Sequence, residues 1–151
     1  MAQSTPLPFF IIQKVFPMLE KVAPKLAGRL GYYLFFRPIP VPLRKEEAEL
    51  QAKAETFALS IDSRKIVGYK WESANANKTA VFMHGWAGKA AQPYELIKAL
   101  INNSYNVYGF DAPGHGASEG RRTHVFEFMH LLHQMQSEIG DFDLLVGHSF
   151  G

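Results

Sequence analysis

The spacing of hydrophobic and polar residues changes character near residue 55 of this chain. Beyond it, short apolar runs at 57–61, 66–71, 79–83, 105–110 and 142–146 are typical of strands. Apolar residues at helical spacing predict helices over 93–102 and 123–139, and Gly140 stands where a cap would end the second helix. The first two runs, separated by a turn at 62–64, predict a hairpin. A hairpin followed by strand–helix–strand–helix–strand predicts an α/β fold, with a mostly parallel sheet and helices on both faces.

The first 45 residues follow a different pattern. Residues 7–36 are apolar and aromatic, with cations at intervals, and we expect Pro17 and Pro24 to break them into short helical pieces. Residues 37–42 repeat proline and predict an extended connector, and residues 44–54 predict a short solvated helix. We therefore divide the chain into a helical, basic and aromatic extension with its connector at 1–45 and a core at 46–151.

The role of the extension has two interpretations. Its aromatic residues and its cations Lys14, Lys21, Lys25 and Arg29 suit an arm at residues 7–36 that makes peripheral contact with a membrane. The alternative is a helical segment that packs on its own domain. We favour packing, because the two prolines would limit the continuous apolar face that a lipid surface could meet.

Composition and charge exclude several classes of function. The net charge of +2 is too small to indicate nucleic-acid binding, although residues 1–45 carry +6 and residues 46–151 carry −4. Without cysteine there is no disulfide and no thiolate metal site. No signal-like start and no apolar run of about 18–20 residues is present, so we expect a cytoplasmic protein.

Three loops that carry candidate catalytic residues follow three of the predicted parallel strands. They are His84-Gly85-Trp86, the segment 111–118 that starts at Asp111, and the final Gly147-His148-Ser149-Phe150-Gly151. Open α/β sheets place their sites at such carboxyl ends of strands. The last loop has the G-x-S-x-G pattern of a sharp strand-to-helix turn that exposes its serine, and its flanks must be small because they approach neighbouring backbone.

In this order, the three loops resemble those of the α/β-hydrolase superfamily, nearest to its monoacylglycerol-lipase-like and serine-aminopeptidase-like branch. The resemblance covers about residues 55–151, the first half of that fold, so it implies an incomplete α/β-hydrolase fold preceded by a helical extension. It implies a serine hydrolase that acts on an ester, thioester or amide and needs no cofactor. Ser149 would be the nucleophile, and the backbone N–H groups of Trp86 and Phe150 would hold the oxyanion.

The remaining loop residues have structural roles under this interpretation. Gly85 would allow close approach of backbone at the oxyanion loop, as Gly147 and Gly151 would at the serine turn, with His84 leading into the loop. Asp111 would hydrogen-bond loop amides while Gly114 and Gly116 permit tight turning. We do not interpret Asp111 as the triad acid, because in the family that acid follows the serine.

No acid or histidine follows Ser149 in these 151 residues. We therefore expect the chain, as a truncated hydrolase core, to be inactive by itself. The alternative is a non-catalytic chain of the same fold, either truncated or binding a partner. A strand at 142–146 without a further neighbour would be an open edge, which predicts self-association.

The other histidines predict no metal site. His124, His130 and His133 share a predicted helix, but no carboxylate cluster converges on them, and solvated helix histidines are the better interpretation. His148 lies inside the serine turn, and we expect its side chain to leave the strand end on a different side from Ser149, which excludes it as the base.

Overall fold

The computed structural model describes the backbone of residues 7–151 and the side chains of residues 12–151. The chain divides into two compact units, Met1–Phe36 and Arg37–Gly151. The connector groups with the second unit, whereas the sequence analysis placed it with the extension. Residues 1–6, where we looked for a signal sequence, lie outside the described residues.

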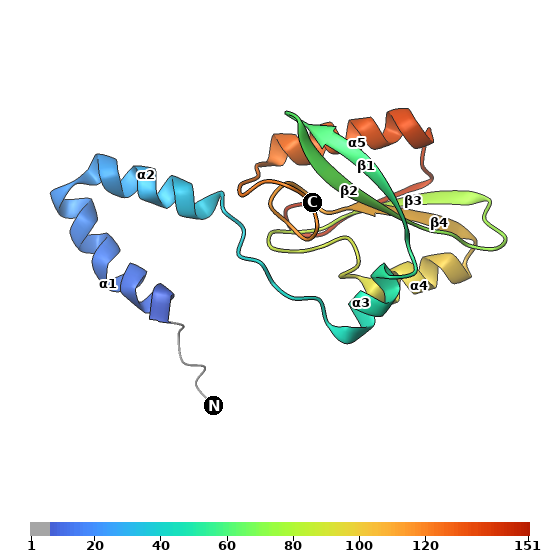
Figure 1. The fold of residues 1–151 in the computed structure, drawn as a ribbon, viewed down its shortest axis with the longest axis horizontal. Coiled ribbons are helices and arrows are strands. Elements are labelled where there is room, and N and C mark those ends of the chain that lie inside the picture. The colour runs from blue at the N-terminus through green and yellow to red at the C-terminus, as the bar shows by residue number, and fades with distance from the viewer. Residues whose placement is uncertain (1–6) are drawn as a thin grey trace. The chain divides into compact units, whose positions relative to one another are not determined.

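The first unit is a pair of helices, α1 (Leu7–Val22) and α2 (Pro24–Phe35) (Figure 1). The expected break at Pro17 is wrong, because α1 continues through it. An internal proline removes one backbone donor, and the other hydrogen bonds of a 16-residue helix hold the element together. Pro24 does begin a new helix, at a first-turn position where the missing donor costs nothing. No helix in the described part of the chain is long and apolar enough to cross a bilayer.

The second unit begins with α3 (Lys45–Gln51) and a hairpin of β1 (Glu55–Ile61) and β2 (Arg64–Trp71). Asp62 and Ser63 form its turn with φ of 46° and 64°. Two successive positive φ values are the signature of a type I′ turn, whose twist matches that of the flanking strands. The turn therefore fixes the register that pairs Ile61 with Arg64.

The rest of the unit alternates strands and helices: β3 (Lys78–Met83), α4 (Tyr94–Asn102), β4 (Tyr105–Phe110), α5 (Val125–Ile139) and β5 (Leu144–Gly147). The sheet order is β1-β2-β4-β3-β5. The β4–β3 and β3–β5 pairs are parallel, while β2 is antiparallel to both β1 and β4. The sheet is therefore mixed, and among its described strands β2 runs against the other four. The predicted α/β fold class is confirmed.

Helices cover both faces of this sheet, as predicted, with α5 on one side and α3 and α4 on the other (Figure 1). Neighbouring strand residues point to opposite faces, so Val81 packs in the cluster under α5 while Ala80 packs in the cluster under α4. The α5 side contains Phe110, Phe128 and Leu131, all almost fully buried. This double-sided burial explains why the strand runs are almost continuously apolar.

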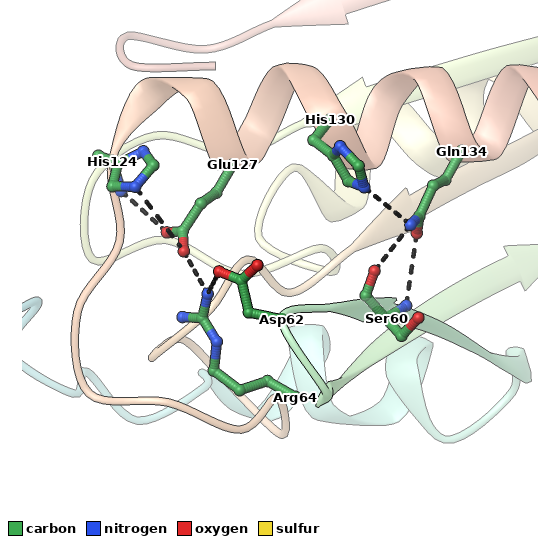
Figure 2. Close-up of polar contacts among 7 residues, drawn as sticks. All are labelled: Ser60, Asp62, Arg64, His124, Glu127, His130 and Gln134. Carbon is green, nitrogen blue, oxygen red and sulfur yellow. Dashed lines mark hydrogen bonds and ion pairs between the residues drawn. The ribbon is translucent and has the colours of Figure 1, made fainter.

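Polar contacts anchor α5 to the hairpin (Figure 2). The buried Glu127 carboxylate accepts a hydrogen bond from the His124 backbone N–H at 3.1 Å and pairs with Arg64 Nη2 at 2.5 Å. Two helix turns later, Gln134 Nε2 donates to the Ser60 carbonyl at 2.7 Å. The same carboxylate therefore caps the start of α5 and ties it to the hairpin end.

We predict that Arg64→Leu lowers the free energy of unfolding by about 2 kcal/mol, because it leaves the buried Glu127 without its cation. Urea unfolding measures the change. Asp62→Asn is the matched control, since Asp62 contacts the same guanidinium from an 84% exposed side chain and should cost well under about 1 kcal/mol. The double variant Arg64→Leu/Glu127→Leu should recover part of the loss, and equal effects of Arg64→Leu and Asp62→Asn would contradict the prediction.

Candidate active site

The three loops singled out in the sequence meet at one edge of the sheet. Strands β4, β3 and β5 are parallel neighbours, so their carboxyl ends at Phe110, Met83 and Gly147 lie side by side. Contact between the loops is close. A methyl group added at Gly85 would lie 3.0 Å from Ser149 Cβ and 2.9 Å from the His148 carbonyl oxygen. The first and third loops therefore touch through backbone, with no room for a side chain at residue 85.

Ser149 occupies a sharp, strained turn after β5. Its φ is 58°, a left-handed conformation that non-glycine residues rarely adopt, and its side chain is exposed. The His148 N–H donates to the Met83 carbonyl at 3.0 Å, and the Gly151 N–H closes the turn on the His148 carbonyl at 3.0 Å. Non-glycine residues in this region concentrate at functional sites, where the surrounding structure imposes the strain.

The glycines beside the serine are there for steric reasons. A Cβ at Gly147 would lie 2.5 Å from the Gly151 carbonyl oxygen, and one at Gly151 would overlap the Met83 carbonyl. The turn folds back on itself and on the end of β3 at the same time. This geometry meets the requirement for small flanking residues that the sequence pattern predicts.

Trp86 and Phe150 face each other across the first and third loops. Their rings pack edge to face with centroids 5.3 Å apart, and Phe150 makes the same kind of contact with Phe128 of α5. Ala87 follows in a left-handed conformation with φ of 57°, and the Gly88 N–H closes a turn on the Gly85 carbonyl at 2.9 Å. The segment 85–88 is therefore a tight turn beside Ser149.

Buried His84 ties the first loop to the second. Its Nε2 accepts a hydrogen bond from the Ala112 backbone N–H at 3.0 Å, so the proton resides on Nδ1, which donates to the Gly85 carbonyl at 2.7 Å. Burial disfavours the charged imidazolium and lowers the pKa of His84 to about 4. The ring is therefore neutral at pH 7, with both nitrogens occupied by backbone groups.

His115 makes the reciprocal connection, and the sequence analysis assigned it no role. Its buried ring accepts the Ala87 N–H at Nε2, 3.1 Å away, and contacts the Pro113 carbonyl through Nδ1 at 3.1 Å. Burial lowers the pKa of His115. A histidine between two loop glycines carries no sequence signal for this contact, because the partner lies 28 residues away.

Asp111 holds the second loop in place. Its buried carboxylate accepts the Ala90 N–H on Oδ1 at 2.9 Å, and the Ala117 N–H at 2.9 Å and the Tyr69 hydroxyl at 3.0 Å on Oδ2. The Tyr69 hydroxyl in turn accepts from Gln51 Nε2 at 2.7 Å, and burial together with the Asp111 charge raises the pKa of Tyr69. The predicted amide contacts of Asp111 are present, and the link to Tyr69 and Gln51 was not foreseen.

Two glycines complete this loop. Gly114 has φ of 74° and its N–H donates to the Glu119 carbonyl at 3.1 Å. Gly116 has φ of 47°, and a side chain there would overlap the Asp111 carboxylate. Both positions thus combine a left-handed backbone with a close approach, the situation that favours glycine.

The side chains of the remaining histidines take no part in these hydrogen bonds, although His148 Nδ1 would lie 3.0 Å from a Cβ added at Gly85. His148 and Ser149 are both exposed, and neither side chain makes a hydrogen bond within the described part of the chain. His124 precedes α5 as its N-cap residue, and His130 and His133 lie on the helix. All three are exposed, and His130 contacts Gln134. Among residues 12–151, no three histidine or acidic side chains are grouped as a metal site would require.

Comparison with known proteins identifies relatives of this fold. The profile of the serine aminopeptidase S33 family matches residues 74–151, just over half of the chain. No curated protein sequence matches. Among solved structures, the thioesterase domain from the curacin biosynthetic pathway is 25% identical with a TM-score of 0.57, over 65% of this chain and 36% of that one.

Two further structures share the fold. The Pyrococcus furiosus esterase Pf2001 is 22% identical with a TM-score of 0.58, over 76% of this chain and 49% of that one. A Vigna radiata epoxide hydrolase is 19% identical with a TM-score of 0.54, over 66% and 32%. The chain thus spans from about a third to half of the length of these structures.

We predict that Gly116→Ala destabilises the chain by about 3 kcal/mol, because the added methyl group overlaps the Asp111 carboxylate and the backbone is left-handed. Gly140→Ala is the matched control. Gly140 also has a positive φ, of 83°, with ψ of −162°, but nothing lies within 4 Å of an added Cβ, so only about 1–2 kcal/mol should be lost to backbone strain. Chemical unfolding compares the two, and equal losses would show that Asp111 imposes no constraint at this position.

The buried histidines predict a loss of stability in acid. Their folded-state pKa values are lowered, so below about pH 6.5 the unfolded chain binds more protons than the folded one, and stability falls as the pH drops towards about 4. Each histidine contributes a slope of up to about 1.4 kcal/mol per pH unit.

The measurement is the urea midpoint at pH 5 and pH 7. His115→Gln keeps an acceptor for the Ala87 N–H without a titrating ring, so the difference between the two midpoints should shrink. His133→Gln, at an exposed position of α5, is the control and should leave the difference unchanged. A wild-type pH dependence in His115→Gln would contradict the prediction.

Proposed function

The chain belongs to the serine aminopeptidase S33 family of α/β-hydrolases, and from this premise we propose that it forms the nucleophile half of a serine hydrolase site. The reaction is acyl transfer from an ester, thioester or amide to Ser149, followed by hydrolysis of the acyl-enzyme. The substrate is a small acyl compound. Two of the similar solved structures are a thioesterase and an esterase, which is compatible with this range of acyl chemistry.

The observation that carries the proposal is the conformation of Ser149. A left-handed φ of 58° at an exposed serine, between glycines that neighbouring backbone forces to be small, is the geometry of a nucleophile presented at a strand end. A serine in an ordinary surface turn needs neither the strain nor the close approach. Here the strain at Ser149 and the close approach of backbone arise where loops from separate parts of the sequence meet.

The oxyanion site follows from the same contacts. We assign the backbone N–H groups of Trp86 and Phe150 as its donors, on the two loops that meet at Gly85 and Ser149. His115 supports this assignment, because its bond to the Ala87 N–H orients the peptide next to Trp86. One donor of this kind is worth about 2.7–4 kcal/mol of transition-state stabilisation.

The base and the acid of a triad are not assigned to residues of this chain. No histidine or acid follows Ser149 in the sequence, and no histidine of the described residues is bonded to its hydroxyl. An unassisted serine is a weak nucleophile at neutral pH. We accordingly propose that the 151-residue chain does not turn over esters, which leaves a partner-binding, non-catalytic chain as the second candidate function.

The test is covalent labelling with a fluorophosphonate probe. We expect a polypeptide in which these residues are followed by the remaining elements of the fold to be labelled and to hydrolyse p-nitrophenyl butyrate. Ser149→Ala should abolish both, with a rate loss of about 10⁴-fold or more. The 151-residue chain should show no turnover above background, because it lacks a base next to Ser149.

Ser137→Ala is the matched control, since Ser137 is an exposed serine of α5 that contacts only the backbone of its own helix. It should leave labelling and turnover unchanged. Labelling of Ser149→Ala at the wild-type level would refute the assignment of the nucleophile. Turnover by the 151-residue chain that is lost in Ser149→Ala would refute the proposed inactivity alone.

A further inference from the structure

The helical pair of the first unit buries little of its apolar surface. The two helices pack where the Phe16 ring lies against Gly31, at which an added Cβ would be 3.2 Å from the ring, and where Ala27 is buried. Beyond this contact, α1 exposes Val15, Met18 and Val22, the last two to 70% and 77%. Large apolar side chains at such exposure are costly in water unless they have a binding partner.

The exposed residues form a strip along each helix. Val15, Met18 and Val22 follow the spacing that places side chains on one face of α1. Leu26, Leu30 and Leu34 do the same on α2, each at least 38% exposed. We call these two sets the apolar strips. Both helices are therefore amphipathic, and a large part of each strip stays exposed beside the contact between them.

Cations border the strips. At 100° per residue, Lys14 and Lys21 project beside the strip of α1, and Lys25 and Arg29 project beside the strip of α2. Glu20 is the one acidic residue between positions 7 and 36 of the sequence. Long basic side chains next to an apolar face can extend their charged ends to lipid head groups while their stems stay on the apolar surface.

The structure removes part of the reason that favoured packing on the core, because only the break at Pro24 remains. That reason was a broken apolar face, but α1 is continuous through Pro17, and Pro24 lies at the start of α2. The aromatic residues Tyr32 and Phe35 are also exposed, to 60% and 65%. The side chains of Phe9, Phe10 and Ile11, which belong to the same apolar sequence, lie outside the described residues.

We propose that the α1–α2 pair docks on the surface of an anionic lipid bilayer. The apolar strips enter the interface and the bordering cations contact acidic head groups. Charge argues against a second copy of this unit as the occupant. A second copy of this unit would bring cations against cations, whereas an anionic lipid surface complements both the charge and the apolar strips. The helices lie along the interface, since neither can span the bilayer.

This inference is independent of the proposed hydrolysis, because its readout is binding. The experiment is co-sedimentation of the full 151-residue chain with vesicles of phosphatidylcholine alone and of phosphatidylcholine with phosphatidylglycerol. We expect binding to the anionic vesicles and much less to the neutral ones. The binding should weaken between roughly 0.1 and 1 M salt, as the Debye length falls from about 10 to 3 Å.

Two matched pairs of variants locate the surface. Lys21→Gln/Lys25→Gln should lower the partition coefficient roughly 25-fold, at about fivefold for each cation near the membrane. Its control, Lys53→Gln/Lys65→Gln, removes two exposed cations of the second unit and should change it less than about twofold. Met18→Ser/Val22→Ser should also lower binding, while Met129→Ser, at a half-exposed site of α5, should not. Circular dichroism confirms that each variant is folded.

Several outcomes would overturn the proposal. They are absence of binding to either vesicle, equal binding to neutral and anionic vesicles, and equal losses in the lysine variant and its control. Sedimentation velocity tests whether the apolar strips bind a second copy of the chain. If the chain binds no lipid and forms dimers that Met18→Ser/Val22→Ser dissociates, the strips are an interface between copies of this chain instead.

Discussion

The arrangement of the candidate site depends on one buried carboxylate. Asp111 accepts hydrogen bonds from Ala90, which follows the oxyanion loop, from Ala117 in its own loop, and from the Tyr69 hydroxyl on β2. A buried carboxylate is costly unless such donors surround it, and here the donors come from three separate segments. The penalty for leaving the charge unpaired therefore forces the segments into a single geometry.

Two neutral histidines extend this bracing to the loop at residues 84–88, which lies against the serine turn. His84 accepts the Ala112 N–H and His115 accepts the Ala87 N–H, and an imidazole can accept only while one nitrogen is unprotonated. Protonation would place a donor opposite a donor at both positions. Burial lowers the pKa of both rings and so favours the neutral form that holds residues 84–88 against the Asp111 loop. The serine turn can keep its strained φ because its neighbours are held in place before any substrate arrives.

Many elements of the fold and the glycines of the candidate site could be predicted from the sequence, because local patterns of residues specify them. The strand at 105–110 and the cap at Gly140 follow from residue spacing and from the turn chemistry of glycine, and both were predicted where they occur. Gly147 and Gly151 were predicted to be small for steric reasons, and the close approaches agree. The contacts of Tyr69 and His115 could not be predicted, because the partners lie 42 and 28 residues away and are brought near only by sheet order. The expected break at Pro17 was wrong. A local rule for proline predicted it, but the hydrogen bonds of the rest of a long helix outweigh the one that proline removes.

The two units differ in how much of their apolar surface they bury, and this difference bears on function. In the second unit the sheet is covered on both faces, so its central strands β3 and β4 bury most of their side chains. In the first unit two helices meet mainly through Phe16, Gly31 and Ala27, a contact too small to cover their apolar strips. Conformational entropy opposes ordering such a pair unless burial offsets it, so a surface that accepts the strips would also stabilise the helices. Because the cations border those strips, the surface that gives most stabilisation is one that is apolar inside and negative outside, as an anionic bilayer is.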